Sequence, residues 1–247
     1  MAVRRGKLEA GSKGQAFWDH LEEFRKRLIV SITAVFLASF VCYFFSGRIL
    51  SFLVKPLTAL AQKAYFLSPY DAFLIKLQVS FWSGLLVAAP LLLTETWLFV
   101  APGLYAKEKK AFLFLLFSSL VLFLFGLAIA FFAVIPVTLR FFLGFSTAEL
   151  SPLISIEQYL SFVVWMGLAF GLAFEMPLFL IGLVKFGILQ IKKLEEMRRY
   201  IVVGIFIFSA VVTPSPDPLS QCLLAVPLWI LFEVSLVIGR MVSDRQG

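Results

Sequence analysis

Long apolar blocks, each about 20 residues and nearly free of charge, constrain this chain most, because a membrane-spanning helix needs that length. Within lipid, only helices and closed barrels pair all of their backbone N–H and C=O groups. Of the 247 residues, 61% are hydrophobic and 15% are charged. These proportions exclude a soluble globular domain and a disordered chain. The sequence therefore predicts an all-α, polytopic membrane protein.

The apolar blocks predict six transmembrane helices within a single membrane domain, residues 15–240. A flexible basic tail, 1–14, precedes this domain, and a short cytoplasmic tail, 241–247, follows it. Residues 15–27 show apolar residues at helical spacing, which predicts an amphipathic helix at the membrane interface. Three prolines in 213–218 interrupt the last apolar stretch and should make the last two helices short. The predicted spans are 28–45, 74–99, 111–137, 159–186, 200–212 and 219–238.

The basic residues predict the orientation of these spans. Seventeen of the 22 Lys and Arg residues fall in the N-terminal region, in the loop after the second span, in the loop after the fourth span or at that span's end, and after the sixth span. Basic residues collect in cytoplasmic loops, so both termini are expected in the cytoplasm. The net charge of +7 follows from this topology. Because no basic face alternates with stacking aromatic residues, we expect no nucleic-acid binding.

No enzyme motif is present in the sequence. The single histidine, His20, cannot form an H-E-x-x-H pair or a multi-histidine metal site. Neither a G-x-S-x-G elbow nor a phosphate-binding P-loop occurs. We therefore expect a protein that is not an enzyme and that uses no metal or cofactor.

Two acidic residues on the predicted cytoplasmic side allow two interpretations. Glu23 lies in the amphipathic helix and Glu108 in the loop after the second span. Carboxylates pair with guanidinium groups through charge-assisted, often bidentate hydrogen bonds. Together the two side chains can recognise an Arg-Arg pair. The alternative is that Glu23 pairs with Arg27 one turn further on and that Glu108 is a solvated loop charge.

Acidic residues also occur inside the predicted spans. Glu175 lies near the middle of the fourth span, two residues before Pro177. A carboxylate at that depth is costly, so it should face a polar cavity or a partner. The alternatives are a carboxyl group satisfied within the helix bundle and the proton carrier of a small-solute permease. Asp217 precedes the sixth span at a position suited to helix capping.

Four stretches resemble the TatC family, the signal-peptide receptor component of the twin-arginine protein translocase. They are HLEEFRKRL at 20–28, FVAPGLYAKEKK at 99–110, FGLAFEMP at 170–177 and TPSPDPLSQCLLAVPLWILFE at 213–233. The chain departs from the family pattern at Phe24, where Leu is usual, at Lys107, where His is frequent, and in TPSPD, one residue longer than the common TPPD.

The resemblance implies a core receptor and scaffold that binds the twin-arginine signal peptides of folded cargo proteins at the cytoplasmic face. It also implies recruitment of small single-span subunits of the TatA and TatB type, self-association within the complex, and export driven by the proton motive force. The expected location is the bacterial or archaeal cytoplasmic (inner) membrane. The rival interpretation is a proton-coupled small-solute permease that uses Glu175; a purely structural assembly protein would need none of these carboxylates.

The resemblance also implies roles for individual residues. It assigns signal-peptide binding to Glu23 and Glu108, with Arg25, Phe99, Pro102, Leu104 and Tyr105 around them. It assigns intramembrane polar or partner contacts to Glu175, Thr213, Asp217, Gln221 and Glu233. It places Pro56 and Asp71 in an external cap over residues 46–73. The alternatives are interfacial anchoring, helix capping and turn formation.

Overall fold

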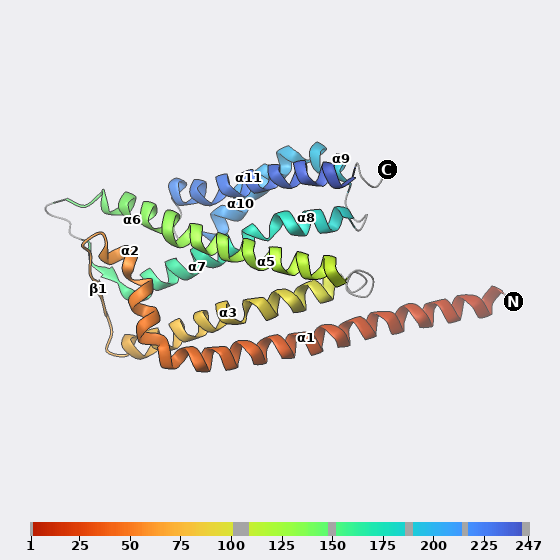
Figure 1. Cartoon of the computed structure of the whole chain (residues 1–247), viewed down its shortest axis with the longest axis horizontal. Helices are drawn as coiled ribbons and strands as arrows, with labels where there is room; N and C mark the ends of the chain where they lie inside the picture. The colour runs from red at the N-terminus through yellow and green to blue at the C-terminus, as the bar shows by residue number, and fades with distance from the viewer. Residues whose placement is uncertain (1, 101–108, 148–151, 186–189, 214–216, 244–247) are drawn as a thin grey trace. The chain divides into compact units, whose positions relative to one another are not determined.

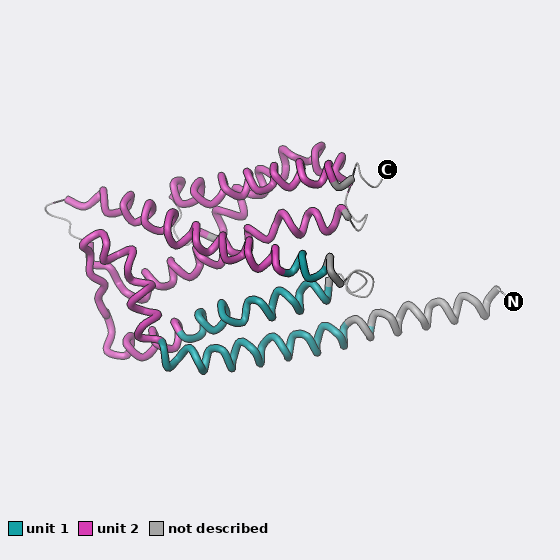
Figure 2. Tube along the Cα trace, in the orientation of Figure 1, with its two compact units in different colours: residues 1–45, 80–116 teal, residues 46–79, 117–247 magenta. Residues whose placement is uncertain are grey.

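The computed structural model describes residues 2–100, 109–147, 152–185, 190–213 and 217–243. Within these residues the chain is helical apart from two short strands and connecting turns (Figure 1), which confirms the all-α prediction. The chain forms two compact units (Figure 2): residues 1–45 with 80–116, and residues 46–79 with 117–247. Helices α1 (Ala2–Leu53), α3 (Asp71–Val100) and α5 (Lys109–Ile129) contribute to both units.

In the first unit, α1 and α3 approach closely where Gly84 faces Ser39. A Cβ atom on Gly84 would lie 2.2 Å from Oγ of Ser39. The Ser39 hydroxyl donates a hydrogen bond to the carbonyl of Phe81 at 3.4 Å. Small residues allow such contacts between membrane helices, where van der Waals packing replaces the hydrophobic effect. Gly84 therefore determines how closely the two helices pack.

Helix α1 runs unbroken from Ala2 to Leu53, so the helix predicted over 15–27 continues directly into the first span, and its place at the membrane interface stays a prediction. Those residues and the first span form one helix. The physical reason is that residues 15–46 contain neither Pro nor Gly, so nothing interrupts the helical hydrogen bonds. Residues 2–14, predicted as a flexible tail, begin the same helix. The division of the chain into tails and one membrane domain stays a prediction.

In the second unit, the core is built around α7 (Ile156–Phe174), whose side chains Leu160, Met166 and Phe170 are completely buried. Close contact between α7 and α5 again depends on glycine. A Cβ atom on Gly126 of α5 would lie 2.6 Å from the carbonyl oxygen of Phe170. This leaves no room for any other residue at position 126.

The third span is longer than the predicted 111–137. Helix α5 continues through a π-helical turn, η1 (Ala130–Val134), into α6 (Ile135–Leu143), giving an apolar helix over Phe112–Leu143. The π turn ends at Val134, two residues before Pro136, which lies in the first turn of α6. Proline lacks an amide hydrogen and crowds the carbonyl four residues earlier, and a π turn relieves that conflict without ending the helix.

The later spans differ in length from one another. The fourth is split at Glu175 into α7 and α8 (Met176–Lys185), and α9 (Ile191–Glu196) follows. Helix α10 (Arg198–Val212) has 15 residues and α11 (Pro218–Ser243) has 26. At about 1.5 Å per residue α10 is about 22 Å long, short of the roughly 30 Å hydrocarbon core.

The prediction that both final helices are short is therefore right for α10 and wrong for α11. Pro227 lies inside α11 without ending it. Proline is tolerated within membrane helices because neighbouring groups satisfy the freed backbone atoms. Among the described residues, five helices are long and apolar enough to cross a membrane, and α10 is the shorter sixth.

The predicted cap over 46–73 meets the segment before α7 within the second unit. Helix α2 (Lys55–Thr58) is followed by strand β1 (Ala64–Tyr65), which pairs in parallel with β2 (Ile154–Ser155). The Tyr159 hydroxyl at the start of α7 donates to the carbonyl of Leu53 at 2.8 Å. These two contacts tie the segment after α1 to the segment before α7.

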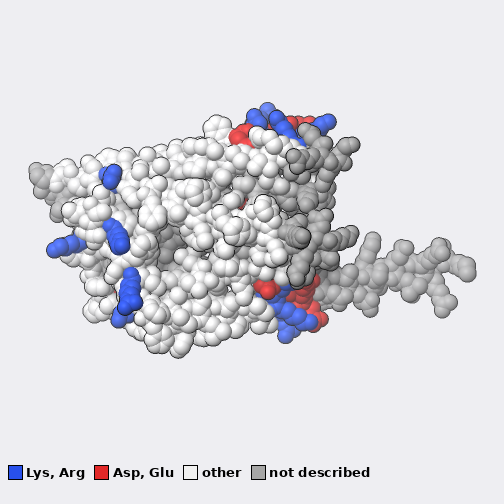
Figure 3. Space-filling model, viewed as in Figure 1, with Lys and Arg blue, Asp and Glu red and all other residues white. Residues whose placement is uncertain are grey.

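The distribution of charge fits a membrane environment. On the face shown in Figure 3, the charged side chains of the described residues gather near the two ends of the view, and the surface between them carries almost none. Many large apolar side chains are exposed among the described residues; Phe36, Phe114 and Phe132 are each at least 70% exposed. Such apolar exposure is stable only against lipid or a partner. The chain is a multi-pass membrane protein.

Candidate functional site: a carboxylate cluster on α1 and α3

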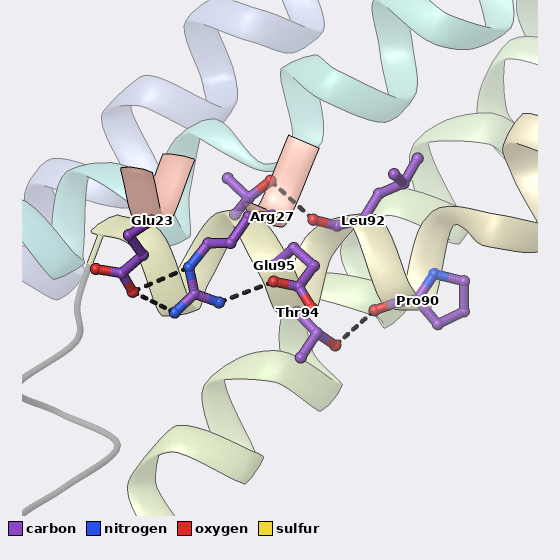
Figure 4. A network of polar contacts seen from close by, with 7 residues as sticks. Glu23, Arg27, Pro90, Leu92, Thr94 and Glu95 are labelled. Atoms are coloured by element: carbon purple, nitrogen blue, oxygen red, sulfur yellow. Dashed lines mark hydrogen bonds and ion pairs between the residues drawn. The ribbon is translucent and has the colours of Figure 1, made fainter. Parts of the chain in front are cut away.

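Glu23 lies on α1 one turn before Arg27, so the two side chains share a face of the helix. Arg27 donates from Nη2 at 2.5 Å and from Nε at 3.1 Å, both to Oε1 of Glu23. Its Nη1 donates at 2.8 Å to Oε2 of Glu95 on α3 (Figure 4). All three residues belong to the first unit. One guanidinium therefore bridges two carboxylates on different helices.

The cluster is partly shielded from solvent and carries an excess of negative charge. The side chains of Arg27, Glu23 and Glu95 are 22%, 40% and 20% exposed. Each carboxylate uses one oxygen in these contacts. Within the described part of the chain, Oε2 of Glu23 and Oε1 of Glu95 accept no hydrogen bond. The cluster thus keeps two acceptors for a further donor.

The neighbouring carboxylate Glu22 has a different environment. It pairs with Lys26 at 2.9 Å, and the two side chains are 61% and 73% exposed. An ion pair this exposed contributes little to stability. The contrast distinguishes Glu23, which faces α3, from Glu22, which faces outward.

The end of α3 near the cluster satisfies its own polar groups. Thr94 donates its hydroxyl to the carbonyl of Pro90 at 2.7 Å (Figure 4), and Thr96 donates to that of Leu92 at 2.8 Å. The carbonyls of Pro90 and Leu92 therefore both receive side-chain hydrogen bonds, and the polar residues around Glu95 remain compatible with an apolar helix.

Of the residues predicted to surround Glu23, two are described. Phe99 of α3 contacts Phe24 of α1, with ring centroids 5.4 Å apart. Arg25 is exposed. The remaining predicted members lie outside the described residues, and their roles stay predictions: Pro102, Leu104, Tyr105 and Glu108.

Glu175, in the second unit, lies at the junction of α7 and α8. The Ser119 hydroxyl of α5 donates to its Oε2 at 2.6 Å. Its Oε1 is buried and has no hydrogen-bond partner among the described residues. Pro177 follows closely, and its missing amide hydrogen leaves the backbone here with fewer internal bonds. The carboxyl group is thus half satisfied within its own unit.

The residues around the connection between α10 and α11 make local bonds. The Asp217 carboxylate accepts from the amide of Ser220 at 2.8 Å, which is the capping contact anticipated as the alternative. Thr213 is buried and donates its hydroxyl to the carbonyl of Ser209 at 2.8 Å. These contacts stabilise the helix ends, and the predicted partner contacts remain predictions.

Two further predicted residues lie on α11. Gln221 donates from Nε2 to the carbonyl of Phe206 on α10 at 3.0 Å. Glu233 forms an ion pair with Arg198 at 3.0 Å and accepts from Trp229 Nε1 at 3.3 Å. Gln221 and Glu233 therefore both connect α11 to α10.

The predicted external cap contains one buried carboxylate. Asp71 is 3% exposed, and its Oδ2 accepts from the amides of Leu67 and Ser68, both at 2.9 Å. Pro56 is buried at the start of α2. The cap is therefore held by specific contacts in the segment that precedes α3.

The sequence interpretation missed Glu95 and Ser119. Glu95 had a detectable signal, because it lies within a predicted span, as Glu175 does. Ser119 had none, since a serine in an apolar helix usually bonds to its own backbone.

Comparisons with known proteins agree along most of the chain. The family model described as "Sec-independent protein translocase protein (TatC)" matches residues 19–227. A protein of that name from Magnetococcus marinus is 38% identical over 232 residues, 93% of this chain and 85% of its own. One from Carboxydothermus hydrogenoformans is 37% identical over 95% of this chain and 96% of its own. A crystal structure of the twin-arginine translocase receptor TatC superposes with a TM-score of 0.82 at 36% identity, covering 91% of this chain and 99% of that one.

Proposed function

Because the chain belongs to the TatC family of Sec-independent protein translocases, we propose that it binds twin-arginine signal peptides through Glu23 and Glu108. The chain is a component of twin-arginine protein transport. The family assignment supports this role and does not support the small-solute permease. The finer statements below concern which residues and partners take part.

The observation that carries the proposal is the binding of a guanidinium by Glu23. The Arg27 side chain donates twice to one Glu23 oxygen, at 2.5 and 3.1 Å, and the Glu23 side chain remains 40% exposed. A carboxylate in this setting suits arginine better than lysine, whose compact ammonium cannot donate from a planar fork. Phe24 and Phe99 beside it offer apolar surface to the residues that flank the arginine pair.

The basic residues support the proposed orientation. Seventeen of 22 Lys and Arg residues lie in segments that the positive-inside rule assigns to the cytoplasm. We place the protein in the bacterial or archaeal cytoplasmic membrane with both termini in the cytoplasm. Glu23 then lies on the side from which cargo arrives, and the proton motive force supplies the work.

Glu175 is the best candidate for contact with small single-span subunits of the TatA or TatB type. Its Oε1 is buried and accepts no hydrogen bond among the described residues. A polar side chain from a partner helix can supply the missing donor, because such groups pair across membrane helices. Gln221 and Glu233 already use polar atoms within the second unit and are weaker candidates.

The test is cross-linking of a twin-arginine peptide that carries a photoreactive residue next to the arginine pair. Peptides with Arg-Arg and with Lys-Lys are compared on the full chain in membranes. We expect Glu23→Ala and Glu108→Ala to leave the protein in the membrane and to reduce Arg-Arg cross-linking. Glu22→Ala is the matched control, because it removes an adjacent, outward-facing carboxylate. Unchanged cross-linking in both test variants would refute the assignment.

A further inference from the structure

The proposed function does not explain why Arg27 bridges two carboxylates. Its guanidinium occupies one oxygen of Glu23 and one of Glu95, on two helices of the same unit. Glu23 is the carboxylate proposed above to bind signal peptides. The resting protein therefore already presents a guanidinium at that position, and it belongs to the protein itself.

We propose that Glu95 is a further carboxylate of the signal-peptide site and that Arg27 occupies this site until an arginine of the peptide replaces it. The inference rests on the proposed function, because it needs Glu23 to bind the peptide. Arg27 then acts as an internal competitor. A signal peptide must offer a guanidinium that can make the same contacts, which selects arginine over lysine.

The geometry provides a route for the exchange. Oε2 of Glu23 and Oε1 of Glu95 accept no hydrogen bond within the described residues, so an incoming guanidinium can bind them before Arg27 leaves. With two carboxylates and one internal cation, the cluster attracts a second cation. The 22% exposure of Arg27 and its four-atom stem allow it to swing toward lipid headgroups, where phosphates accept its hydrogen bonds.

Competition has a measurable consequence. When only a fraction of the protein has the site free, the apparent affinity for the peptide falls by that fraction. Removing the internal guanidinium should therefore tighten peptide binding, whereas removing a group that merely positions Glu23 should weaken it. The two roles predict changes of opposite sign.

The experiment measures binding of fluorescent Arg-Arg and Lys-Lys peptides to the full chain in lipid nanodiscs. We expect Arg27→Gln to tighten Arg-Arg peptide binding by about fivefold or more. Lys26→Gln is the matched control. It also removes one positive charge, at the residue next to Arg27, but this charge belongs to an exposed ion pair with Glu22. It should change binding less than about twofold, since exposed charges are screened.

Two more variants complete the design. Adding Glu95→Gln to Arg27→Gln should weaken binding again by about fivefold, because a peptide contact is lost. Arg27→Lys keeps the positive charge but loses the planar set of guanidinium donors. Its affinity for the Arg-Arg peptide should therefore lie between those of wild type and Arg27→Gln. It keeps the test decisive if Arg27→Gln does not fold.

The outcomes separate the two proposals. If wild type prefers Arg-Arg over Lys-Lys but neither Arg27 variant binds more tightly than Lys26→Gln, the internal competitor is refuted and the receptor role stands. If Glu95→Gln has no effect in the Arg27→Gln background, Glu95 is not part of the site. If wild type shows no preference for Arg-Arg, both proposals fail.

Discussion

Replacing Asp71 by alanine should destabilise the second unit by about 3 kcal/mol. The carboxylate is 3% exposed and accepts from the amides of Leu67 and Ser68, both at 2.9 Å. A hydrogen bond to a charged group contributes about 1.5–3 kcal/mol. Leu67 is exposed, so its amide can turn to water after the substitution. We therefore use the lower value for each bond, which gives about 3 kcal/mol for two.

The measurement is the free energy of unfolding of the purified protein, obtained by titrating SDS into mild detergent. Asp71→Asn retains an acceptor oxygen but loses the charge, and we expect it to cost about 1–2 kcal/mol. Glu157→Ala is the control, because Glu157 is an exposed carboxylate in the first turn of α7. It should cost less than about 1 kcal/mol, the contribution of a helix-dipole charge. Equal effects of Asp71→Ala and Glu157→Ala would show that the two amide contacts do not hold the cap.

Gly126→Ala should lower the free energy of unfolding by about 1–3 kcal/mol, because its Cβ would lie 2.6 Å from the carbonyl oxygen of Phe170 and force α5 from α7. Gly204→Ala, where nothing lies within 4 Å, should instead stabilise α10 by up to about 1 kcal/mol, and a similar loss in both variants would argue against the close contact. Glu175→Gln should reduce export of a twin-arginine reporter in cells, whereas Ser119→Ala, which removes only the internal partner at 2.6 Å, should reduce it less. Normal export by Glu175→Gln would indicate a purely structural carboxyl group.

The boundaries of the helices show where local sequence was a good guide. The predicted second span, 74–99, lies inside α3, and the predicted fifth span, 200–212, differs from α10 by two residues at one end. The apolar character of each segment depends only on its own residues. The sequence could not indicate that α1 continues unbroken from Ala2, because a polar amphipathic segment and an apolar span can form one helix.

Proline positions were the weakest guide to where helices end. Pro90 and Pro227 lie inside helices, and Pro136 follows a π turn in a helix that continues. In water, an interior proline costs about 3 kcal/mol and commonly ends a helix. In lipid, ending a helix exposes several backbone groups at once, so the chain tolerates the local defect.

From the residues alone we could predict the membrane environment, the helical class, the family resemblance and the candidate carboxylates Glu23 and Glu175. These depend on composition and short motifs, which act over one or two turns. Only the tertiary structure joined Arg27 to Glu95 across 68 residues and Ser119 to Glu175 across 56. Which faces of two helices meet is decided by side-chain packing along their whole length, with glycine at the closest points, and one helix alone does not contain that information.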